Sequence, residues 1–215
     1  MYYVLDEKIE FPSVDVADED GLLAIGGDLS EERLIFAYKN GIFPWYNEMD
    51  PILWWSPDPR CVLFPKKIKV SKSMQQLLRQ PKFQFTKNEC FSQVIKQCQT
   101  ISRKDGNGTW INEDIIDSYS QLYKKGFALS AETWMNGKLV GGLYGVKIGK
   151  VFYGESMFSL VSNASKFALI KLVAQLSNEG VQLIDCQMKT DHLLKMGGEM
   201  IDRQYYIELL NKYCH

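Results

Sequence analysis

Residues 128–158 decide the fold and read ALSAETWMNGKLVGGLYGVKIGKVFYGESMF. Three segments of this stretch, 128–134, 138–148 and 150–158, are rich in the β-branched and aromatic residues that favour strands. A Gly149-Lys150 turn joins the last two segments and predicts a hairpin. The centre of the protein is therefore expected to be a mixed, mainly antiparallel sheet.

Helical patterns flank these strands on both sides. After them, Asn163 is expected to cap a helix that ends at Gly180, because apolar residues recur between these two at the 3.6-residue helical spacing. A strand over 181–187 and a final helix or loop follow. Helices are also expected before the strands, at 71–80, 89–101 and 112–125. Together these elements predict an α+β fold with helices flanking the sheet.

The first 60 residues are rich in loops and hold five of the seven prolines. One short helix is expected there, with Ser30 as its N-cap and Asn40-Gly41 at its end. We expect a small N-terminal domain over residues 1–62 and a larger domain over 63–215.

The composition, 46% hydrophobic and 24% charged over 215 residues, is typical of a globular protein. Acidic residues by position 6, and no run of about 18 apolar residues, predict a soluble and unexported chain. Five cysteines without a C-x-x-C pair, with only two histidines, favour neither a disulfide scaffold nor a zinc site.

Charge is distributed unevenly along the chain. Residues 1–58 contain 13 Asp or Glu against 3 Lys or Arg, whereas residues 60–87 contain 8 Lys or Arg and no acid. This asymmetry indicates a polyanion-binding face, and the alternative is an ordinary solvated basic surface.

Polar residues stand among apolar ones in two of the expected strands. Because residues two apart in a strand face the same way, Asp185 and Gln187 should lie side by side. The same alternation should place Tyr153, Glu155 and Met157 on one face. A carboxylate beside a flexible apolar side chain suits a pocket with one charged and one apolar end.

Eight stretches of the chain match one known family: 21–29, 37–45, 51–60, 109–111, 141–145, 154–158, 163–166 and 184–187. Over nearly its whole length the chain therefore resembles the bacterial leucyl/phenylalanyl-tRNA-protein transferases. The resemblance implies a small N-terminal domain followed by an acetyltransferase-like (GNAT-type) domain. It also implies a cytoplasmic, monomeric aminoacyltransferase that moves Leu or Phe, and also Met, from aminoacyl-tRNA to proteins with N-terminal Arg or Lys, which marks them for degradation without a metal or cofactor.

The same resemblance implies roles for individual residues. Asp185 and Gln187 would form the reaction centre, and Glu155 would bind the acceptor. The aminoacyl-adenosine end of the donor would meet Tyr38, Trp45, Trp110, Tyr119, Leu143 and Met157. The basic stretch 60–87, and not the resemblance, suggests the residues expected to hold the tRNA backbone, which are Lys66, Lys67, Lys69, Lys72 and Arg79.

The chain departs from the family pattern at several positions, which bear on fine specificity and local geometry and not on the reaction class. The residues that differ are Glu19-Asp20 for Pro-Asn, Leu129 for His, Leu143 for Met, Thr190 for Asn and Asp202 for Pro.

Aminolysis of an aminoacyl ester requires mainly that the amine and the carbonyl be held together and the oxyanion stabilised. An α-amino group with a pKa of about 8 is partly neutral at cellular pH, so a strong base is not required. The Gln187 carbonyl could accept a hydrogen bond from the amine while Asp185 fixes the amide. As ordinary structural residues, Asp185, Gln187 and Glu155 would instead be polar groups of strands.

Other polar and aromatic residues are interpreted as structural. Trp54 and Trp55 are expected to pack, His192 to make a structural hydrogen bond, and Cys186 to be packed on the face opposite Asp185.

Three competing functions remain open. An acyl-CoA-dependent N-acetyltransferase could place its pyrophosphate at residues 103–108, RKDGNG, but the residues before this segment read as a helix where such a loop should follow a strand. An RNA-binding module would use only the basic stretch. A transferase acting on a cell-wall precursor would keep the tRNA donor and change the acceptor.

Overall fold

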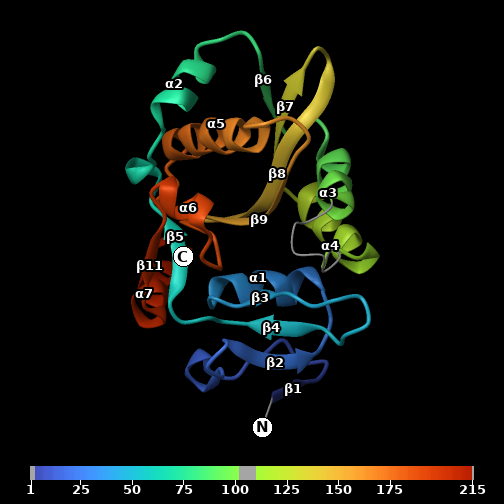
Figure 1. The fold of residues 1–215 in the computed structure, drawn as a ribbon. Helices are drawn as coiled ribbons and strands as arrows, with labels where there is room; N and C mark the ends of the chain where they lie inside the picture. The colour runs from blue at the N-terminus through green and yellow to red at the C-terminus, as the bar shows by residue number, and fades with distance from the viewer. Residues whose placement is uncertain (1–2, 102–109, 215) are drawn as a thin grey trace.

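The computed structural model describes residues 3–101 and 110–214. A four-stranded sheet lies at the N-terminal end and a seven-stranded sheet, with helices on both faces, forms the rest (Figure 1). The expected α+β class is therefore confirmed. No helix within the described ranges is long and apolar enough to cross a membrane.

The small sheet has the strand order β1-β2-β4-β3, in which only β1 and β2 run parallel. Helix α1 (Glu31–Lys39) lies between this sheet and β9, and Ser30 caps it by accepting a hydrogen bond from the Arg33 amide, as expected (Figure 1). The strands are β1 (Tyr3–Leu5), β2 (Leu22–Gly26), β3 (Phe43–Pro44) and β4 (Leu53–Trp55), with a 3-10 turn η1 (Val14–Val16).

The large sheet has the order β11-β5-β10-β9-β8-β7-β6, and only β9 and β10 are parallel neighbours. The mixed, mainly antiparallel character and the β8–β9 hairpin are as predicted. Its strands are β5 (Arg60–Leu63), β6 (Gln84–Lys87), β7 (Ala128–Met135), β8 (Lys138–Ile148), β9 (Val151–Ser159), β10 (Leu183–Asp185) and β11 (Glu199–Ile201).

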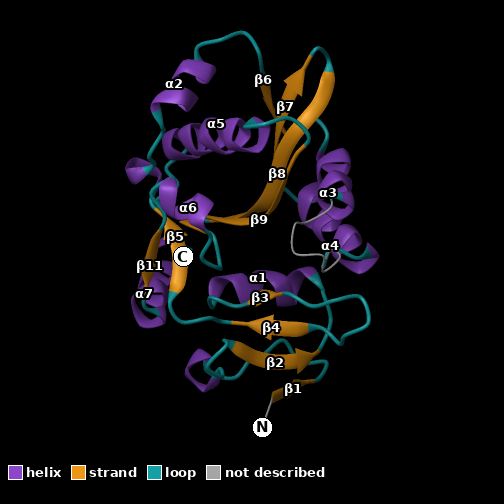
Figure 2. Cartoon of the chain, viewed as in Figure 1, coloured by secondary structure: helices purple, strands orange, loops and turns teal. Residues whose placement is uncertain are grey.

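Helices cover the large sheet on both faces (Figure 2). Buried residues of α1, α3 and α4 join one apolar cluster, and those of α5 belong to a second cluster. The helices, beside α1, are α2 (Lys72–Leu78), α3 (Phe91–Thr100), α4 (Glu113–Lys124), α5 (Ala164–Asn178), α6 (Asp191–Lys195) and α7 (Arg203–Tyr213), with a 3-10 turn η2 (Pro65–Lys67).

The start of α5 differs from the expectation. Asn163 occupies the cap position with a left-handed φ of 69° and makes no side-chain cap hydrogen bond. The Ser159 hydroxyl accepts from the Ser165 amide instead, at 3.2 Å. A residue four positions before the cap therefore satisfies a free amide of the first turn.

The expected domain division after residue 62 falls within β5, which pairs with β10 and β11 in the large sheet. The division into residues 1–62 and 63–215 stays a prediction.

A β-bulge in β9 corrects the predicted facing of its side chains. Gly145 pairs with Gly154 and Tyr144 pairs with Ser156, so Glu155 has no partner across the hairpin. The extra residue reverses the alternation that follows. Tyr153 lies in the first cluster, whereas Met157 packs against the second. The prediction that Met157 shares a face with Tyr153 is therefore wrong.

The bulge requires glycine at position 145 of β8 but not at position 154 of β9. A Cβ at Gly145 would lie 2.1 Å from the Tyr153 carbonyl oxygen, whereas one at Gly154 would come no closer than 3.7 Å to Asp185. Because overpacking a core typically costs about 1 to 3 kcal/mol, Gly145→Ala should lower the free energy of unfolding, measured by urea denaturation, by at least that much. Gly154→Ala is the matched control, and equal losses in the two variants would refute this account of the bulge.

Candidate active site

A cavity of about 470 Å³ opens where β9 and β10 part. Their pairing ends at Tyr153 and Asp185, after which β9 continues past the bulge and β10 stops. The cavity is lined by Phe43, Pro44, Trp45, Trp110, Leu143, Phe152, Gly154, Glu155, Ser156, Met157, Leu169, Ile184, Cys186, Gln187, Met188, Thr190, His192 and Leu193.

Four of the six residues expected to meet the donor line this cavity. Leu143 and Met157 pack with the cluster under α5 and form part of its apolar wall. Trp110 is nearly buried, whereas Trp45 is 38% exposed. Trp54 is fully buried, and its indole N–H donates to the Gly26 carbonyl oxygen, which confirms its packing role.

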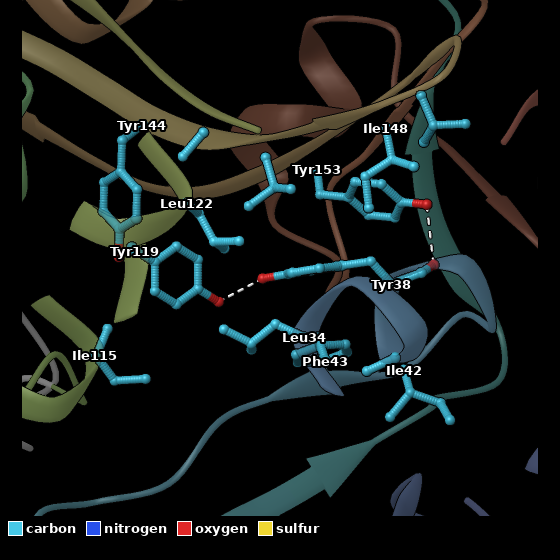
Figure 3. Packing of buried hydrophobic residues seen from close by; sticks show 14 of the residues in the cluster. Leu34, Tyr38, Ile42, Phe43, Ile115, Tyr119, Leu122, Tyr144, Ile148 and Tyr153 are labelled. Carbon is cyan, nitrogen blue, oxygen red and sulfur yellow. Dashed lines mark hydrogen bonds between the residues drawn. The ribbon is translucent and has the colours of Figure 1, made fainter. Parts of the chain in front are cut away.

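The other two expected donor residues, Tyr38 and Tyr119, are buried behind the cavity wall. Both hydroxyls donate to the Glu155 carboxylate, at 2.8 and 3.2 Å, and the two hydroxyls also contact each other. Figure 3 shows them meeting end to end within the core, with Tyr153 donating to the Tyr38 carbonyl oxygen. In this structure they hold Glu155 and do not line the cavity.

Glu155 is a titratable group of the cavity wall, and its surroundings shift its pKa. Burial raises the pKa of its carboxyl to about 7, although the hydrogen bonds from Tyr38 and Tyr119 act in the opposite direction. Burial also raises the pKa values of both tyrosines, so their hydroxyls remain protonated donors at neutral pH. Glu155 can therefore change charge near neutral pH.

Gln187 lies beyond the end of β10, at a point where the chain turns. Its φ of 54° is in the left-handed region, so it is not the third residue of an alternating strand face. Its side-chain amide nevertheless donates to Glu155, at 3.5 Å. The expected pair of Asp185 and Gln187 is brought together by this turn and not by strand alternation.

Asp185 is fully buried and does not line the cavity. Its carboxylate accepts from the Gln187 backbone amide at 2.9 Å and from the Tyr206 hydroxyl at 2.8 Å. The contact expected with the Gln187 side-chain amide is thus made to the backbone. Asp185 fixes the turn that carries Gln187, which is a positioning contact.

Arg60 is the partner of Asp185 that the sequence analysis did not single out. Its guanidinium donates two hydrogen bonds to the Asp185 carboxylate, at 2.9 and 2.7 Å, and one to the Gly41 carbonyl oxygen. Burial would lower the pKa of Arg60, but the attraction of Asp185 outweighs it and raises the pKa. Arg60 is fully buried, so it is not part of the exposed basic stretch. A lone arginine in the apolar strand 60–63 was the available signal.

Several further residues line the cavity without having been predicted there. Cys186 is half-buried in the wall, where it was expected only to pack. Thr190 caps α6 by accepting from the Leu193 amide, so this departure from the family pattern is locally satisfied. Burial, and next the charge of Lys166, lower the pKa of His192. Strand alternation places Ile184 on the face opposite Asp185, so the sequence carried a signal that could have indicated Ile184 as a cavity residue.

The five basic residues expected to hold tRNA are all exposed, on η2, on α2 and in the segment between them. Lys67 forms an ion pair with Glu199. The Lys69 amide donates to the Met196 carbonyl oxygen just after α6, which joins this segment to a wall of the cavity.

Two further predictions concern the segment 103–108 and the binding of metal ions. Residues 103–108 lie outside the described residues, and the segment before them forms α3 as expected. Within residues 3–101 and 110–214, no group of three or more His, Cys, Asp or Glu side chains could hold a metal ion.

Two family profiles match the chain. The profile of the leucyl/phenylalanyl-tRNA protein transferase covers residues 62–211, and the profile of the N-terminal domain of the same transferase covers residues 27–58. The chain belongs to this family. It is thus an aminoacyltransferase that uses aminoacyl-tRNA and protein substrates.

Curated relatives of the same family match the chain over nearly its full length. The leucyl/phenylalanyl-tRNA–protein transferase of Christiangramia forsetii is 54% identical over 97% of this chain and 99% of its own. That of Flavobacterium johnsoniae is 52% identical over 98% and 99%.

Solved structures show a weaker likeness. A GCN5-related N-acetyltransferase-like protein from Streptococcus suis aligns with a TM-score of 0.40 and 14% identity, over 74% of this chain and 59% of its own. A GCN5-related N-acetyltransferase from Kribbella flavida aligns at 0.38 and 10%, over 78% and 59%. The fold class rests on the strand order and the helices described above, since likenesses of this size add nothing to it.

Proposed function

We propose that this transferase moves Leu or Phe, and also Met, from aminoacyl-tRNA to the α-amino group of proteins with N-terminal Arg or Lys. The modified proteins are marked for degradation, and the enzyme works in the cytoplasm as a monomer. One observation supports the proposal most: a single cavity combines an apolar wall with a carboxylate, Glu155, and an amide, Gln187, that contact each other.

The apolar wall suits the side chain of the donor amino acid. Leu143, Phe152 and Ile184 belong to the buried cluster under α5, and they line the cavity on that side. Trp45 and Trp110 would contact the terminal adenosine, because aromatic faces stack on bases. A wall of fixed aliphatic groups distinguishes donors by shape at the branching carbon, since one methylene is worth only about 1 to 3 kcal/mol.

Glu155 would bind the basic side chain of the acceptor. A carboxylate in apolar surroundings attracts a guanidinium or ammonium group more strongly than one in water does. Tyr38 and Tyr119 hold both of its oxygens from behind. The face toward the cavity is left for the acceptor and for Gln187.

Gln187 would orient the attacking amine. Its side-chain carbonyl can accept a hydrogen bond from the amine while its amide group stays on Glu155. Because the α-amino group is partly neutral near pH 8, no stronger base is needed. Arg60 and Tyr206 act through Asp185, which keeps the backbone of Gln187 in its turn.

The exposed basic segment of η2 and α2 would hold the tRNA backbone. Each phosphate contact releases counterions, so affinity should fall steeply as salt rises. In filter binding, Lys69→Ala combined with Lys72→Ala should reduce the slope of log affinity against log salt by about 2, roughly 1 for each contact. Lys8→Ala, an exposed lysine near β1, is the matched control. An unchanged slope in the double variant would place the tRNA elsewhere.

The choice of donor tests the proposed function. The enzyme is incubated with an Arg-initiated peptide and, in separate reactions, leucyl-, phenylalanyl- or isoleucyl-tRNA or acetyl-CoA, and the products are identified by mass. Leucyl and phenylalanyl products are expected, with at least about tenfold less isoleucyl product. Comparable isoleucyl transfer would contradict the role of the apolar wall, and acetylation would favour the acyl-CoA alternative.

A further inference from the structure

Cys61 and Cys186 face each other on neighbouring strands at the cavity wall. The antiparallel pairing of β5 with β10 ends at Val62 and Asp185, and one residue further on the Cys186 amide donates to the Cys61 carbonyl oxygen at 2.9 Å. Facing residues in antiparallel strands have Cα atoms about 4.5 to 5.5 Å apart. That separation lies within the range of about 4.4 to 6.8 Å that a disulfide spans.

The two thiols also contact each other and differ in exposure. Their mutual hydrogen bond lowers the pKa of Cys61, and the same bond together with burial raises the pKa of Cys186. Cys61 is fully buried, whereas Cys186 is half-buried and lines the cavity. A small reagent in the cavity therefore meets Cys186 first, with the thiol of Cys61 directly behind it.

We propose that Cys61 and Cys186 form a reversible disulfide site in the cavity wall, oxidised by a low-molecular-weight disulfide. Because the pKa of Cys186 is raised, it reacts through the small fraction that has lost its proton to solvent, and that thiolate attacks one sulfur of the reagent to give a mixed disulfide and one small thiolate. The Cys61 thiolate then attacks the Cys186 sulfur and expels the second small thiolate. In total, two protein thiols are oxidised to a disulfide and one small disulfide is reduced to two thiols.

Closing this bond should change the position of Gln187. Gln187 follows Cys186 in the chain, and its carbonyl oxygen accepts from the Cys61 amide at 3.2 Å. A displacement of about 1 Å at a reacting group can cost on the order of a hundredfold in rate. The oxidised enzyme should therefore lose roughly ten- to a hundredfold of its transfer rate. This consequence, unlike the bond itself, rests on the proposed function.

The test treats the whole enzyme with 2-hydroxyethyl disulfide. A non-reducing peptide map should show one bridge between the peptides of Cys61 and Cys186, and transfer should fall and then return after reduction with dithiothreitol. Cys61→Ala should form no such bridge and should stop at the mixed disulfide, with one half of the reagent on the Cys186 peptide. Cys90→Ala, which removes a half-buried thiol outside the cavity lining, should behave like the wild type.

Two results would overturn the proposal. One is a map in which the wild type forms no bridge or bridges another pair of cysteines, a result that does not depend on any transfer assay. The other is a Cys61→Ala variant whose Cys186 peptide carries no half of the reagent, because Cys186 would then not be the thiol that the reagent meets. If the bridge forms in an enzyme that transfers nothing before oxidation, the disulfide site stands and the proposed function fails.

Discussion

Replacing Arg60 with leucine should lower the free energy of unfolding by about 3 to 5 kcal/mol, the usual cost of removing one partner of a buried ion pair. The cost is large because the Asp185 carboxyl group would lose its cationic partner where water does not reach it. The variant also loses the hydrogen bond to the Gly41 carbonyl oxygen. It further loses the cation–π contacts with the Phe43 and Tyr206 rings, whose centroids lie 4.7 and 4.8 Å from the guanidinium carbon. Urea denaturation measures the loss.

The double variant Arg60→Leu with Asp185→Leu separates the charge from the packing. Because replacing both members of a buried pair by apolar groups is often nearly neutral, the double variant should be more stable than Arg60→Leu alone. It should still transfer poorly, since the Gln187 amide has lost its acceptor. If the double variant is at least as unstable as Arg60→Leu alone, the loss of stability does not come from leaving Asp185 without its partner. Normal transfer by the double variant would show that Asp185 does not position Gln187.

Glu155→Gln should reduce transfer to Arg-initiated peptides by on the order of ten- to a hundredfold, because a charge-assisted contact is worth about 1.5 to 3 kcal/mol. The substitution keeps the shape of the side chain and removes its charge. Binding of tRNA, measured by filter binding, should persist. The effect should appear in transfer to the peptide, compared with a peptide that begins with citrulline, the uncharged analogue of arginine.

The preference for arginine over citrulline should also depend on pH. The pKa of Glu155 is raised to about 7, so its carboxyl is mostly neutral at pH 6 and mostly charged at pH 8. The ratio of the two transfer rates should therefore rise over this interval in the wild type. Ionisation of the peptide α-amino group affects both peptides alike and cancels in the ratio.

Glu155→Gln should give a ratio that is low and independent of pH. Glu179→Gln, which removes a carboxylate outside the cavity lining, should keep the wild-type dependence. A ratio that stays constant with pH in the wild type, or that still rises in Glu155→Gln, would assign the acceptor site to another group.

Local signals in the sequence predicted much of the secondary structure. Capping by Ser30 and the Gly149-Lys150 turn act between residues close in the chain, so α1 and the β8–β9 hairpin follow from the sequence. The bulge at Glu155 does not, because it depends on how β8 and β9 pair. One extra residue was enough to reverse the predicted face of Met157.

The candidate site depends on contacts between residues far apart in the chain. Family resemblance named Glu155, but not that Tyr38 and Tyr119 hold it from α1 and α4. Arg60 and Asp185 are 125 residues apart, and no periodicity connects them. The left-handed turn at Gln187 could not be predicted either, because distant and side-chain contacts hold it: the Asp185 carboxylate accepts from the Gln187 amide, and the Cys61 amide donates to the Gln187 carbonyl oxygen.

The most direct test of the proposed reaction is a competition for leucyl-tRNA among peptides that differ only at residue 1. The peptides begin with Arg, Lys, Ala and Asp, are mixed at equal concentration with the wild-type enzyme, and their leucylated products are quantified by mass spectrometry. We expect leucine on the Arg- and Lys-initiated peptides, at least about tenfold above the others. Equal leucylation of the Asp-initiated peptide, or no leucylation of any peptide, would contradict the proposed transfer.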